Sequence, residues 1–357
     1  MNAPFLPEKL ILRLVDPGDG AQAARIDAFL ADHGEATPFH RPAWLNAVAR
    51  GTGNRALALI GERHGAIAGY LPVNEIHSAI FGRMLASSGF AVDGGLLLAG
   101  SDGEPFFAGL EELASRTNCS AIELRGGVQP DASAQWTIKT ESHCGFIAPL
   151  LADDEAQLLS IPRKQRAEVR KGLANELTVE VGSSARDRDA HCAVYAESVR
   201  NLGTPVFPRA LFDAVLDYFG TDADILTVRA DGVPVASVLS LYHRGAVMPY
   251  WGGGTFAARR LRANDRMYFE LMRHAAARGC TRFDFGRSKT GSGAYDFKRN
   301  WGFEPQRLSY ASWTAPGAKE RDANPNSAKH AAQIAMWRKL PLGIANRLGP
   351  LIAKGLG

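Results

Sequence analysis

The second half of this chain predicts a strand, two helices, three antiparallel strands, a helix and a further strand, and the first half gives most of the same order. The repeat shows in the residues, because GERHGAIAGYLPV (61–73) resembles RADGVPVASVLSL (229–241), and SRTNCSAIELRG (115–126) resembles ARGCTRFDFGRS (277–288). The Asp-Gly pair at 231–232 suits a type I′ turn between two strands. The sequence therefore predicts a fold of the α/β class with two tandem domains. Each domain is expected to contain a mixed sheet of parallel and antiparallel strands, the α+β arrangement.

The two domains are predicted to meet at a charged segment. We expect a first domain at 1–151, closed by short strands near 136–140 and 146–150, and a second domain at 177–314. Residues 152–176 are expected to form a basic helical connection between them. Residues 315–357 follow as a linker and a basic amphipathic tail. A length of 357 residues fits this division into two domains.

The stretch Thr281–Tyr310, TRFDFGRSKTGSGAYDFKRNWGFEPQRLSY, gathers basic, aromatic and glycine residues. Its pattern predicts a strand, a polar loop, a short helix ended at Gly302, and another strand. Basic and aromatic groups then lie between a strand end and a helix start, where α/β sheets bind ligands. The alternative is a solvated surface loop. The ligand-binding interpretation selects Arg287, Ser288, Lys289, Tyr295 and Trp301.

Composition excludes several classes of function. A net charge of +4 does not indicate a dedicated nucleic-acid-binding protein, so we expect no DNA partner. The four cysteines form no CxxC pair and no metal-like spacing with histidine, so we expect reduced thiols and no metal. No GxSxG, HExxH or Walker pattern occurs. The N-terminus lacks the order of a signal peptide, and no run of 18 apolar residues exists, so we expect a cytoplasmic chain.

The connection between the domains contains IPRKQRAEVRKG, with five basic residues between Arg163 and Lys171. Charge runs are usually solvated helix faces. A helix that turns four of these side chains toward one cleft would instead bind an anion: Arg163, Arg166, Arg170 and Lys171. Both interpretations stay open at the level of sequence.

The element order and three motifs resemble the FemAB family. The motifs are RKQRAEVRKG (163–172), YWGGGT (250–255) and FDFGRSKTGSGAYDFKRNWGFEP (283–305). Among FemAB-like proteins, the sequence most resembles those associated with exosortase/PEP-CTERM systems and exopolysaccharide loci. The resemblance implies two tandem GNAT-like (acyl-CoA N-acyltransferase-like) domains. It also implies transfer of an amino acid from aminoacyl-tRNA to an amine on a peptidoglycan precursor.

The resemblance assigns a catalytic role to the lysine of an FK pair near the end of the second domain, which is Lys298 here. Attack on an ester or thioester forms an oxyanion, and a fixed ammonium lowers the energy of that oxyanion. Without the motif, Lys298 would be taken for a surface lysine on an exposed helix. Tyr250 and Trp251 end a strand beside the expected cleft, so we expect them in the pocket wall, with burial in the core as the alternative.

The expected position of a coenzyme A loop departs from the GNAT pattern. GNAT enzymes that use acetyl-CoA hold its pyrophosphate with a glycine-rich turn and a helix N-terminus. Here residues 254–264 read GTFAARRLRAN, with no glycine after Gly254 and with three arginines. Arg260 and Asn264 are therefore expected to contact another anion, with a solvated loop as the alternative. We expect no bound cofactor, and an acyl donor that is either aminoacyl-tRNA or an acyl thioester.

The sequence is compatible with three functions. The first is a transferase that moves an acyl or aminoacyl group to an amine or hydroxyl of a cell-envelope or exopolysaccharide precursor. The second is a GNAT-type transferase that uses an acyl-CoA or acyl-carrier thioester. The third is a GNAT-derived protein that binds ligands without catalysis at an exopolysaccharide or protein-sorting locus.

The tail 328–356 places apolar residues at helical spacings and contains five basic and no acidic residues. We expect it to dock on the body of the protein, burying Trp337, Ile344 and Leu348. Weak peripheral contact with the inner face of the membrane is the additional expectation.

Overall fold

The computed structural model describes residues 9–78, 81–100, 102–319 and 328–357. The chain divides into two compact units, and each is described by itself. The first consists of Met1–Lys139, Ser309–Asp322 and Lys354–Gly357, and the second of Thr140–Leu308 and Ala323–Ala353. Both units are mixed α/β structures, as the sequence predicts.

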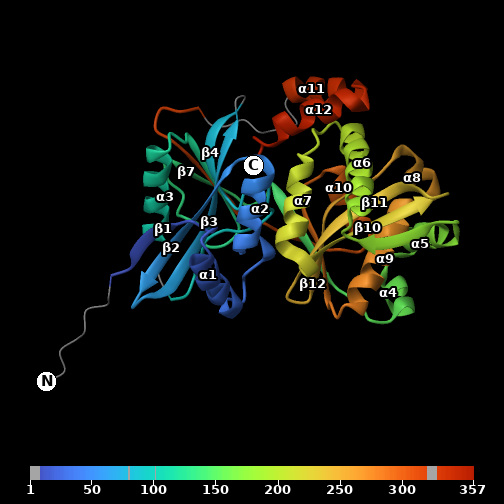
Figure 1. Ribbon diagram of the computed structural model, residues 1–357, viewed down its shortest axis with the longest axis horizontal. Helices are drawn as coiled ribbons and strands as arrows, with labels where there is room; N and C mark the ends of the chain where they lie inside the picture. Colours follow the sequence, from blue (N-terminus) through green and yellow to red (C-terminus); the bar gives the residue numbers. More distant parts are fainter. Residues whose placement is uncertain (1–8, 79–80, 101, 320–327) are drawn as a thin grey trace. The chain divides into compact units, whose positions relative to one another are not determined.

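The first unit contains a mixed sheet with helices on both faces (Figure 1). Its sheet has the order β1-β2-β3-β4-β6-β15-β7, and β5 pairs with β3. The elements are β1 (Ile11–Val15), α1 (Gly20–Asp32), the 3₁₀ turn η1 (Pro38–His40), α2 (Pro42–Thr52), β2 (Arg55–Arg63), β3 (Ala66–Ser78), β4 (Gly82–Ser87), β5 (Leu97–Leu98), α3 (Glu104–Arg116), β6 (Ala121–Arg125), β7 (Trp136–Lys139) and β15 (Tyr310–Thr314).

The second unit repeats this arrangement with the sheet order β14-β8-β13-β12-β11-β10-β9. Its first elements are β8 (His143–Pro149), α4 (Asp154–Ser160), α5 (Arg163–Ala174), β9 (Thr178–Gly182), α6 (Ala185–Leu202), α7 (Arg209–Phe219) and the 3₁₀ turn η2 (Gly220–Asp222). The central elements are β10 (Ala223–Ala230), β11 (Val233–His243), β12 (Ala246–Gly254), α8 (Phe256–Leu261) and α9 (Ala263–Ala277). The last are β13 (Arg282–Lys289), α10 (Gly293–Asn300), β14 (Pro305–Arg307), α11 (Ala328–Lys339) and α12 (Leu342–Ala353).

The two halves of the chain exchange one strand each, which corrects the expected domain contents. β8 was expected to close the first domain, but it lies between β13 and β14 in the second sheet. β15 was expected in the second domain, but it lies between β6 and β7 in the first sheet. The exchanged strand occupies the same position in both sheets. Each unit is therefore completed by a segment from the other half of the sequence.

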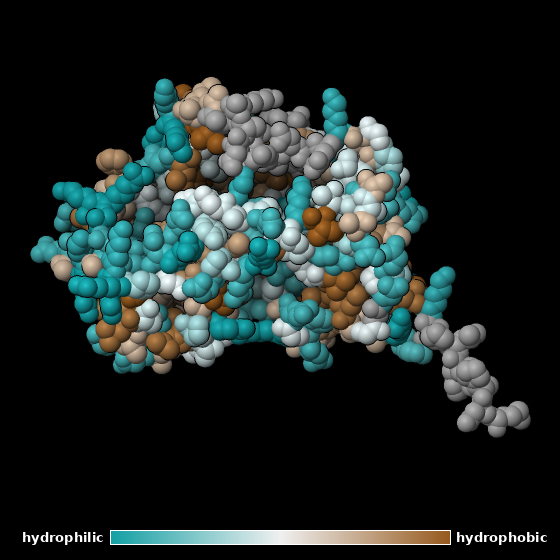
Figure 2. Space-filling view, turned by 180° about the vertical axis from the view of Figure 1, so that it is seen from behind, coloured by the Kyte–Doolittle hydropathy of each residue, from teal (hydrophilic) through white to brown (hydrophobic). Residues whose placement is uncertain are grey.

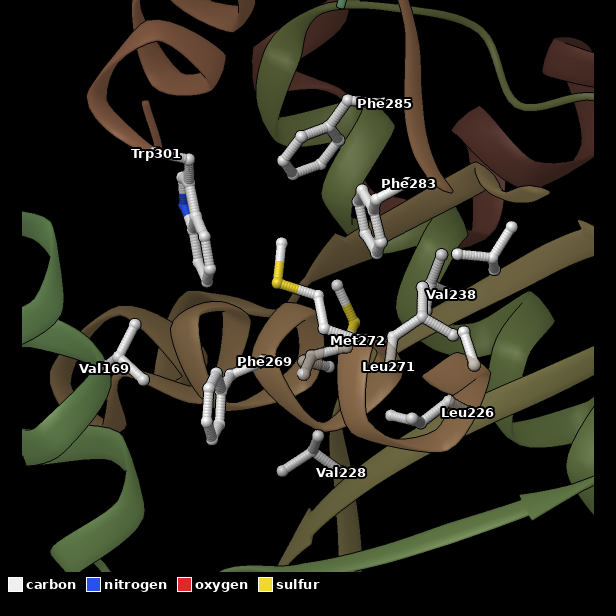
Figure 3. Close-up of a cluster of buried hydrophobic side chains, with 14 of the residues drawn as sticks. Val169, Leu226, Val228, Val238, Phe269, Leu271, Met272, Phe283, Phe285 and Trp301 are labelled. Atoms are coloured by element: carbon white, nitrogen blue, oxygen red, sulfur yellow. The ribbon is translucent and has the colours of Figure 1, made fainter. Parts of the chain in front are cut away.

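Alternation along the strands of the second unit separates two layers. Leu226, Val228 and Val238 face a core that contains α9 residues such as Phe269 and Met272, and Figure 3 shows these side chains together. On the opposite face, His191 of α6 forms a 3.0 Å hydrogen bond to the Ser237 hydroxyl. The sheet is thus covered by α9 on one face and by α6 on the other.

The tail packs against α6, as the docking interpretation predicts (Figure 1). Trp337 is buried, as expected. Ile344 and Leu348 were also expected to be buried, but they are 47% and 44% exposed. α12 instead contacts the body through small residues, since Ala345, Gly349 and Ala353 are buried. No helix among the described residues has the length and hydropathy needed to cross a membrane.

Candidate functional site

Lys298 lies in α10 and is buried, with only 9% of its surface exposed. Its Nζ donates hydrogen bonds to the carbonyl oxygens of Arg287 at 2.9 Å and Gly286 at 3.2 Å. The rings of Phe146 and Phe285 lie 5.4 and 5.7 Å from Nζ, within the range of cation–π contact. The surface-lysine alternative therefore does not describe Lys298, which is a buried amine in contact with two carbonyl oxygens and two aromatic rings.

A bulge in β13 presents the two carbonyls to Lys298. The register of β13 against β8 shifts between Asp284 and Arg287, which places an extra residue in β13. Gly286 adopts φ +66° there, a left-handed conformation that glycine tolerates best. Its N–H donates to the Asp284 carboxylate at 2.8 Å, which holds the bulge in place. The glycine that ends the predicted strand is thus the residue that aims backbone oxygens at the amine.

Burial lowers the pKa of Lys298 from 10.5 to about 8. The Arg287 charge lowers this pKa further, and the Asp284 carboxylate opposes both effects. At neutral pH the amine is still mostly an ammonium ion with three hydrogens. Two of those hydrogens are used by the bulge carbonyls, and one is left for a ligand oxygen.

The two strands next to this site diverge. β12 and β13 pair in parallel only at Ala246↔Arg282 and Val247↔Phe283, although β12 continues to Gly254. Near the ends of the diverging strands, the side-chain oxygens of Thr255, Asn264 and Ser288 are buried and have no hydrogen-bond partner in the protein. Buried polar atoms are rarely left unpaired, so these oxygens are candidates to contact a ligand. Ser288 and Asn264 belong to the residues predicted from sequence.

The predicted aromatic residues divide into two groups. Trp301 and Trp251 are only 3% and 5% exposed and lie in the core, where Trp301 packs on Phe285 and Trp251 on Phe212. For Trp251 the core alternative describes the structure, and Trp301, which was expected to bind the ligand, is a core residue as well. Tyr295 is half-buried, 5.4 Å from the Phe146 ring, and Tyr250 is half-buried against Trp251. Tyr295 is therefore the predicted aromatic residue that lies next to the lysine.

The basic helix α5 connects two parts of the second unit. Its start meets α10, because Pro162 lies within 3.0 Å of the β-carbon position at Gly302. Its end meets the junction of α8 and α9, where the Asn175 side chain donates to the Leu261 carbonyl at 2.8 Å. Gln165 also donates to the Asp265 carboxylate at 2.6 Å. α5 therefore lies across the start of α9.

The predicted arginines of α5 differ in their contacts. Arg166 donates to the Leu159 carbonyl at 3.2 Å, and Arg170 pairs with Glu155 at 4.0 Å. Arg163 is exposed. Arg287 and Lys289 are half-buried on β13 beside the bulge. Arg166 is thus hydrogen-bonded to the connection that precedes α5, and an anion-binding role for the three α5 arginines stays a prediction.

The expected loop at 256–264 is a short helix, α8, which corrects the sequence prediction. Arg262, a non-glycine residue at φ +52°, turns the chain from α8 directly into α9. Arg260 is exposed on α8, and Phe256 is 74% exposed on the same helix. The first turn of α9 contains Asp265, whose pKa is raised by burial. The start of α9 is thus covered by α8 and α5 and carries an acidic side chain.

A hollow in the first unit contains none of these groups. It has a volume of about 460 Å³ and is lined by α1 and the β2–β3 hairpin. Its main cation, Arg25, is paired with Glu62 at 2.6 Å. This hollow offers no obvious reactive amine or thiol, so Lys298 remains the center of the candidate site.

Comparison with known proteins shows which fold contains the candidate site. Residues 162–299 match the family model for the acetyltransferase (GNAT) domain. The structure of FemX is similar to this chain, with a TM-score of 0.62 at 15% identity over 81% of this chain and 95% of FemX. A tandem GNAT protein from the clavulanic acid biosynthesis pathway has a TM-score of 0.57 at 11% identity, over 87% of this chain and 100% of its own.

The fold is two GNAT-like domains in tandem. The C-terminal domain of a proposed lysylphosphatidylglycerol synthetase from Agrobacterium fabrum is also similar, with a TM-score of 0.55 at 15% identity over 83% of this chain and 93% of that domain. No curated protein matches this sequence. In the second GNAT-like domain, β12 and β13 are the diverging strands, and the short helix α8 and then the longer helix α9 follow β12.

Two groups at the site were missed by the sequence analysis. Phe146 was assigned to the first domain, so its ring was not expected beside Lys298. The Gly286 and Arg287 carbonyls were missed because a side-chain pattern does not reveal where backbone oxygens point. The Gly286 that follows FDF is a signal for the bulge, but only the partner strand β8 shows the shift in register.

Proposed function

We propose that this protein transfers an acyl or aminoacyl group to an amine or hydroxyl of a cell-envelope or exopolysaccharide precursor, and that Lys298 in the second GNAT-like domain supports the chemical step. The observation that carries the proposal is the buried ammonium of Lys298, fixed by two carbonyls with one hydrogen left over. A preorganised cation of this kind stabilises charge that develops on an acyl oxygen.

In the proposed step, the acceptor nitrogen or oxygen attacks the acyl carbon of an ester or thioester. The carbonyl oxygen becomes an oxyanion and accepts the remaining hydrogen bond from Lys298. The tetrahedral intermediate then expels the carrier hydroxyl or thiol, which takes up the proton that the acceptor releases. A single electrostatic contact of this type contributes on the order of 10²–10³ in rate.

We favour aminoacyl-tRNA over coenzyme A as the carrier. A coenzyme A site needs open backbone N–H groups at the start of the helix after β12. Here the helix after β12 is the short α8, and its first N–H, that of Phe256, already donates to the Glu197 carboxylate at 2.8 Å. The longer helix α9 begins only after α8, and its start is covered by α8 and α5 and carries the Asp265 carboxylate, which repels phosphate. α8 instead exposes Phe256 with Arg259 and Arg260, the combination of a stacking ring and phosphate-binding cations that suits a nucleic-acid end.

The acceptor belongs to the cell envelope in this proposal. Support comes from the similarity of fold to FemX and to a proposed lysylphosphatidylglycerol synthetase, and from the motif resemblance to FemAB-like proteins of exosortase/PEP-CTERM and exopolysaccharide loci. The reaction would take place in the cytoplasm, at the inner face of the membrane where such precursors are made.

A donor screen tests the proposal. Purified protein is incubated with a fraction of lipid-linked and soluble envelope precursors, and with either labelled aminoacyl-tRNA or labelled acyl-CoA. Label transferred from aminoacyl-tRNA, and lost in Lys298→Ala, is the expected result. Transfer from acyl-CoA alone would establish the thioester alternative. Binding of a precursor without transfer from either donor would establish the non-catalytic alternative.

A further inference from the structure

The C-terminal helix α12 docks on the body through its small residues. Ala345, Gly349 and Ala353 are buried and recur every four residues, so they form one face of the helix. At Gly349 a β-carbon would lie 2.9 Å from the backbone nitrogen of Val206, so the helix backbone approaches the segment after α6 closely. The large apolar residues are therefore not the ones that hold α12 in place.

The opposite side of α12 exposes a ridge of aliphatic side chains, formed by Ile344, Leu348 and Leu351. These residues are 47%, 44% and 64% exposed. Their spacing of four and then three residues places them on a single side of the helix. Figure 2 shows apolar residues, in tan and brown, at the top of the molecule, where Figure 1 places α11 and α12.

The charged residues of the tail itself all have one sign. Arg347 lies within α12 and is exposed, and Lys354 directly follows the helix. Arg338 and Lys339 are exposed in the last turn of α11. The sequence contains no acidic residue between Ala328 and Gly357. The ridge is therefore bordered by cations with no neighbouring acidic residue from its own segment.

We propose that the ridge Ile344–Leu348–Leu351 inserts into the surface of an anionic lipid bilayer, with α12 lying parallel to the membrane. An exposed aliphatic side combined with basic flanks is the pattern of interfacial helices. Each lysine or arginine near anionic lipid strengthens binding, and each buried aliphatic side chain adds to it. The cationic border favours lipid headgroups over a second copy of this chain, whose own ridge carries the same charge.

The small-residue face lets one helix serve two contacts at once. Its inner side remains packed on the body while its outer side enters the lipid, so binding requires no unfolding of the tail. A basic amphipathic helix that hid its large residues against the body would have nothing to insert. This proposal does not depend on the proposed function, since none of its residues belongs to the Lys298 site.

Vesicle sedimentation with the full chain tests the inference. The probes are vesicles of phosphatidylcholine with phosphatidylglycerol, and vesicles of phosphatidylcholine alone. The ridge variant replaces Ile344, Leu348 and Leu351 with serine. The matched control replaces three exposed aliphatic residues of the same unit with serine: Leu159, Val181 and Val233. A charge variant, Arg347→Gln, examines the electrostatic contribution by itself.

The wild type and the matched control are expected to bind the anionic vesicles, and binding is expected to weaken in raised salt. The ridge variant should bind about a hundredfold more weakly. Arg347→Gln should bind about fivefold more weakly while leaving the ridge intact. Melting temperatures of all variants, measured in parallel, show whether the exposed positions can be changed without loss of folding.

Three results would overturn the inference. The first is a wild type that does not sediment with anionic vesicles. The second is a ridge variant that binds them as tightly as the wild type does. The third is a wild type that dimerises through the tail and becomes monomeric in the ridge variant, which would assign the ridge to a second copy of the chain.

Discussion

The two sheets of this protein correspond strand for strand, but they differ in which residues lie beside the central parallel pair of strands. β4 and β6 in the first unit correspond to β12 and β13 in the second, and each is a parallel pair next to an antiparallel hairpin. In each sheet the next strand comes from the other half of the chain. Because the frameworks agree, the functional difference must come from what lies at the diverging pair.

In the first unit, the segment that follows β4 fills the space beside the parallel pair β4 and β6. Residues 88–96 are fixed by buried contacts: Trp44 donates to the Gly89 carbonyl, Arg125 to the Ala91 carbonyl and Tyr310 to the Val92 carbonyl. In the second unit, the corresponding region is bordered by Lys298, the β13 bulge and unpaired buried oxygens. In the first unit this position is thus closed into a core, while in the second unit it contains buried polar side chains that have no hydrogen-bond partner among the described residues.

The largest expected effect is the loss of transfer in Lys298→Ala. Removal of the ammonium should lower the rate on the order of 10²–10³, because the oxyanion loses its fixed charge. Arg299→Ala is the matched control, since Arg299 is an exposed cation on the same helix. Single-turnover rates and melting curves measure both variants. Full activity of Lys298→Ala on the true substrate would remove the lysine from the mechanism.

The next largest effect is a loss of stability when the packing of residues 88–96 in the first unit is disturbed. A β-carbon at Gly95 would overlap the Gly126 carbonyl oxygen, so Gly95→Ala should destabilise the protein by about 3 kcal/mol. Gly34→Ala, where a β-carbon meets nothing within 4 Å, is the control and should be close to neutral. Denaturant melts compare the two. Equal stability would mean that residues 88–96 are loosely packed, and that the contrast between the units is weaker.

The pH dependence of transfer should report the protonation of Lys298. Its pKa of about 8 means that the ammonium is present below pH 8 and is lost as the pH rises through that value. The ratio of wild-type rate to that of Lys298→Arg should therefore fall about tenfold between pH 7 and pH 9, since a guanidinium stays charged. Taking this ratio cancels the ionisation of the acceptor. A ratio that does not change with pH would contradict the charged role.

The smallest effect is expected in calorimetry with free coenzyme A. The covered start of α9 and the carboxylate of Asp265 leave no phosphate site there, so we expect no binding at micromolar concentration. A measured affinity of about −8 kcal/mol, equivalent to a micromolar Kd, would favour the thioester alternative. Asp265→Asn tests the carboxylate separately, and it should gain little because α8 still covers the helix start.

Much of this fold follows from local patterns in the sequence. The hairpin with Asp231–Gly232, the α5 helix, and the strand and short helix on the two sides of Gly286 are indicated by residue type and spacing. The bulge at Gly286 is not indicated, because the pattern ends the strand there, whereas β13 continues to Lys289. The exchange of β8 and β15 is not indicated either, because a short alternating strand fits either sheet equally well. Only the register with β13 or β6 decides where each strand belongs.

The buried face of α12 and the helix α8 could not be predicted from the sequence either, because tertiary contacts decide both. The apolar spacing of α12 predicts an amphipathic helix, but it does not say whether Leu348 or Gly349 faces the body, and close backbone packing selects the small residues. The helix α8 depends on Arg262 in a left-handed conformation, which is uncommon for a residue other than glycine. Tertiary contacts with α5 decide both the turn and the covering of α9.

The central claim is that Lys298 is a buried, carbonyl-bound amine, and its own titration tests that claim most directly. Lysine labelled with ¹³C at Cε, assigned by comparison with Lys298→Arg, can be followed by NMR between pH 6 and pH 12, as a shift of the Cε signal. We predict a midpoint of about 8, well below the ordinary lysine value of 10.5. A midpoint near 10.5 would show a solvated amine and contradict the account of the site.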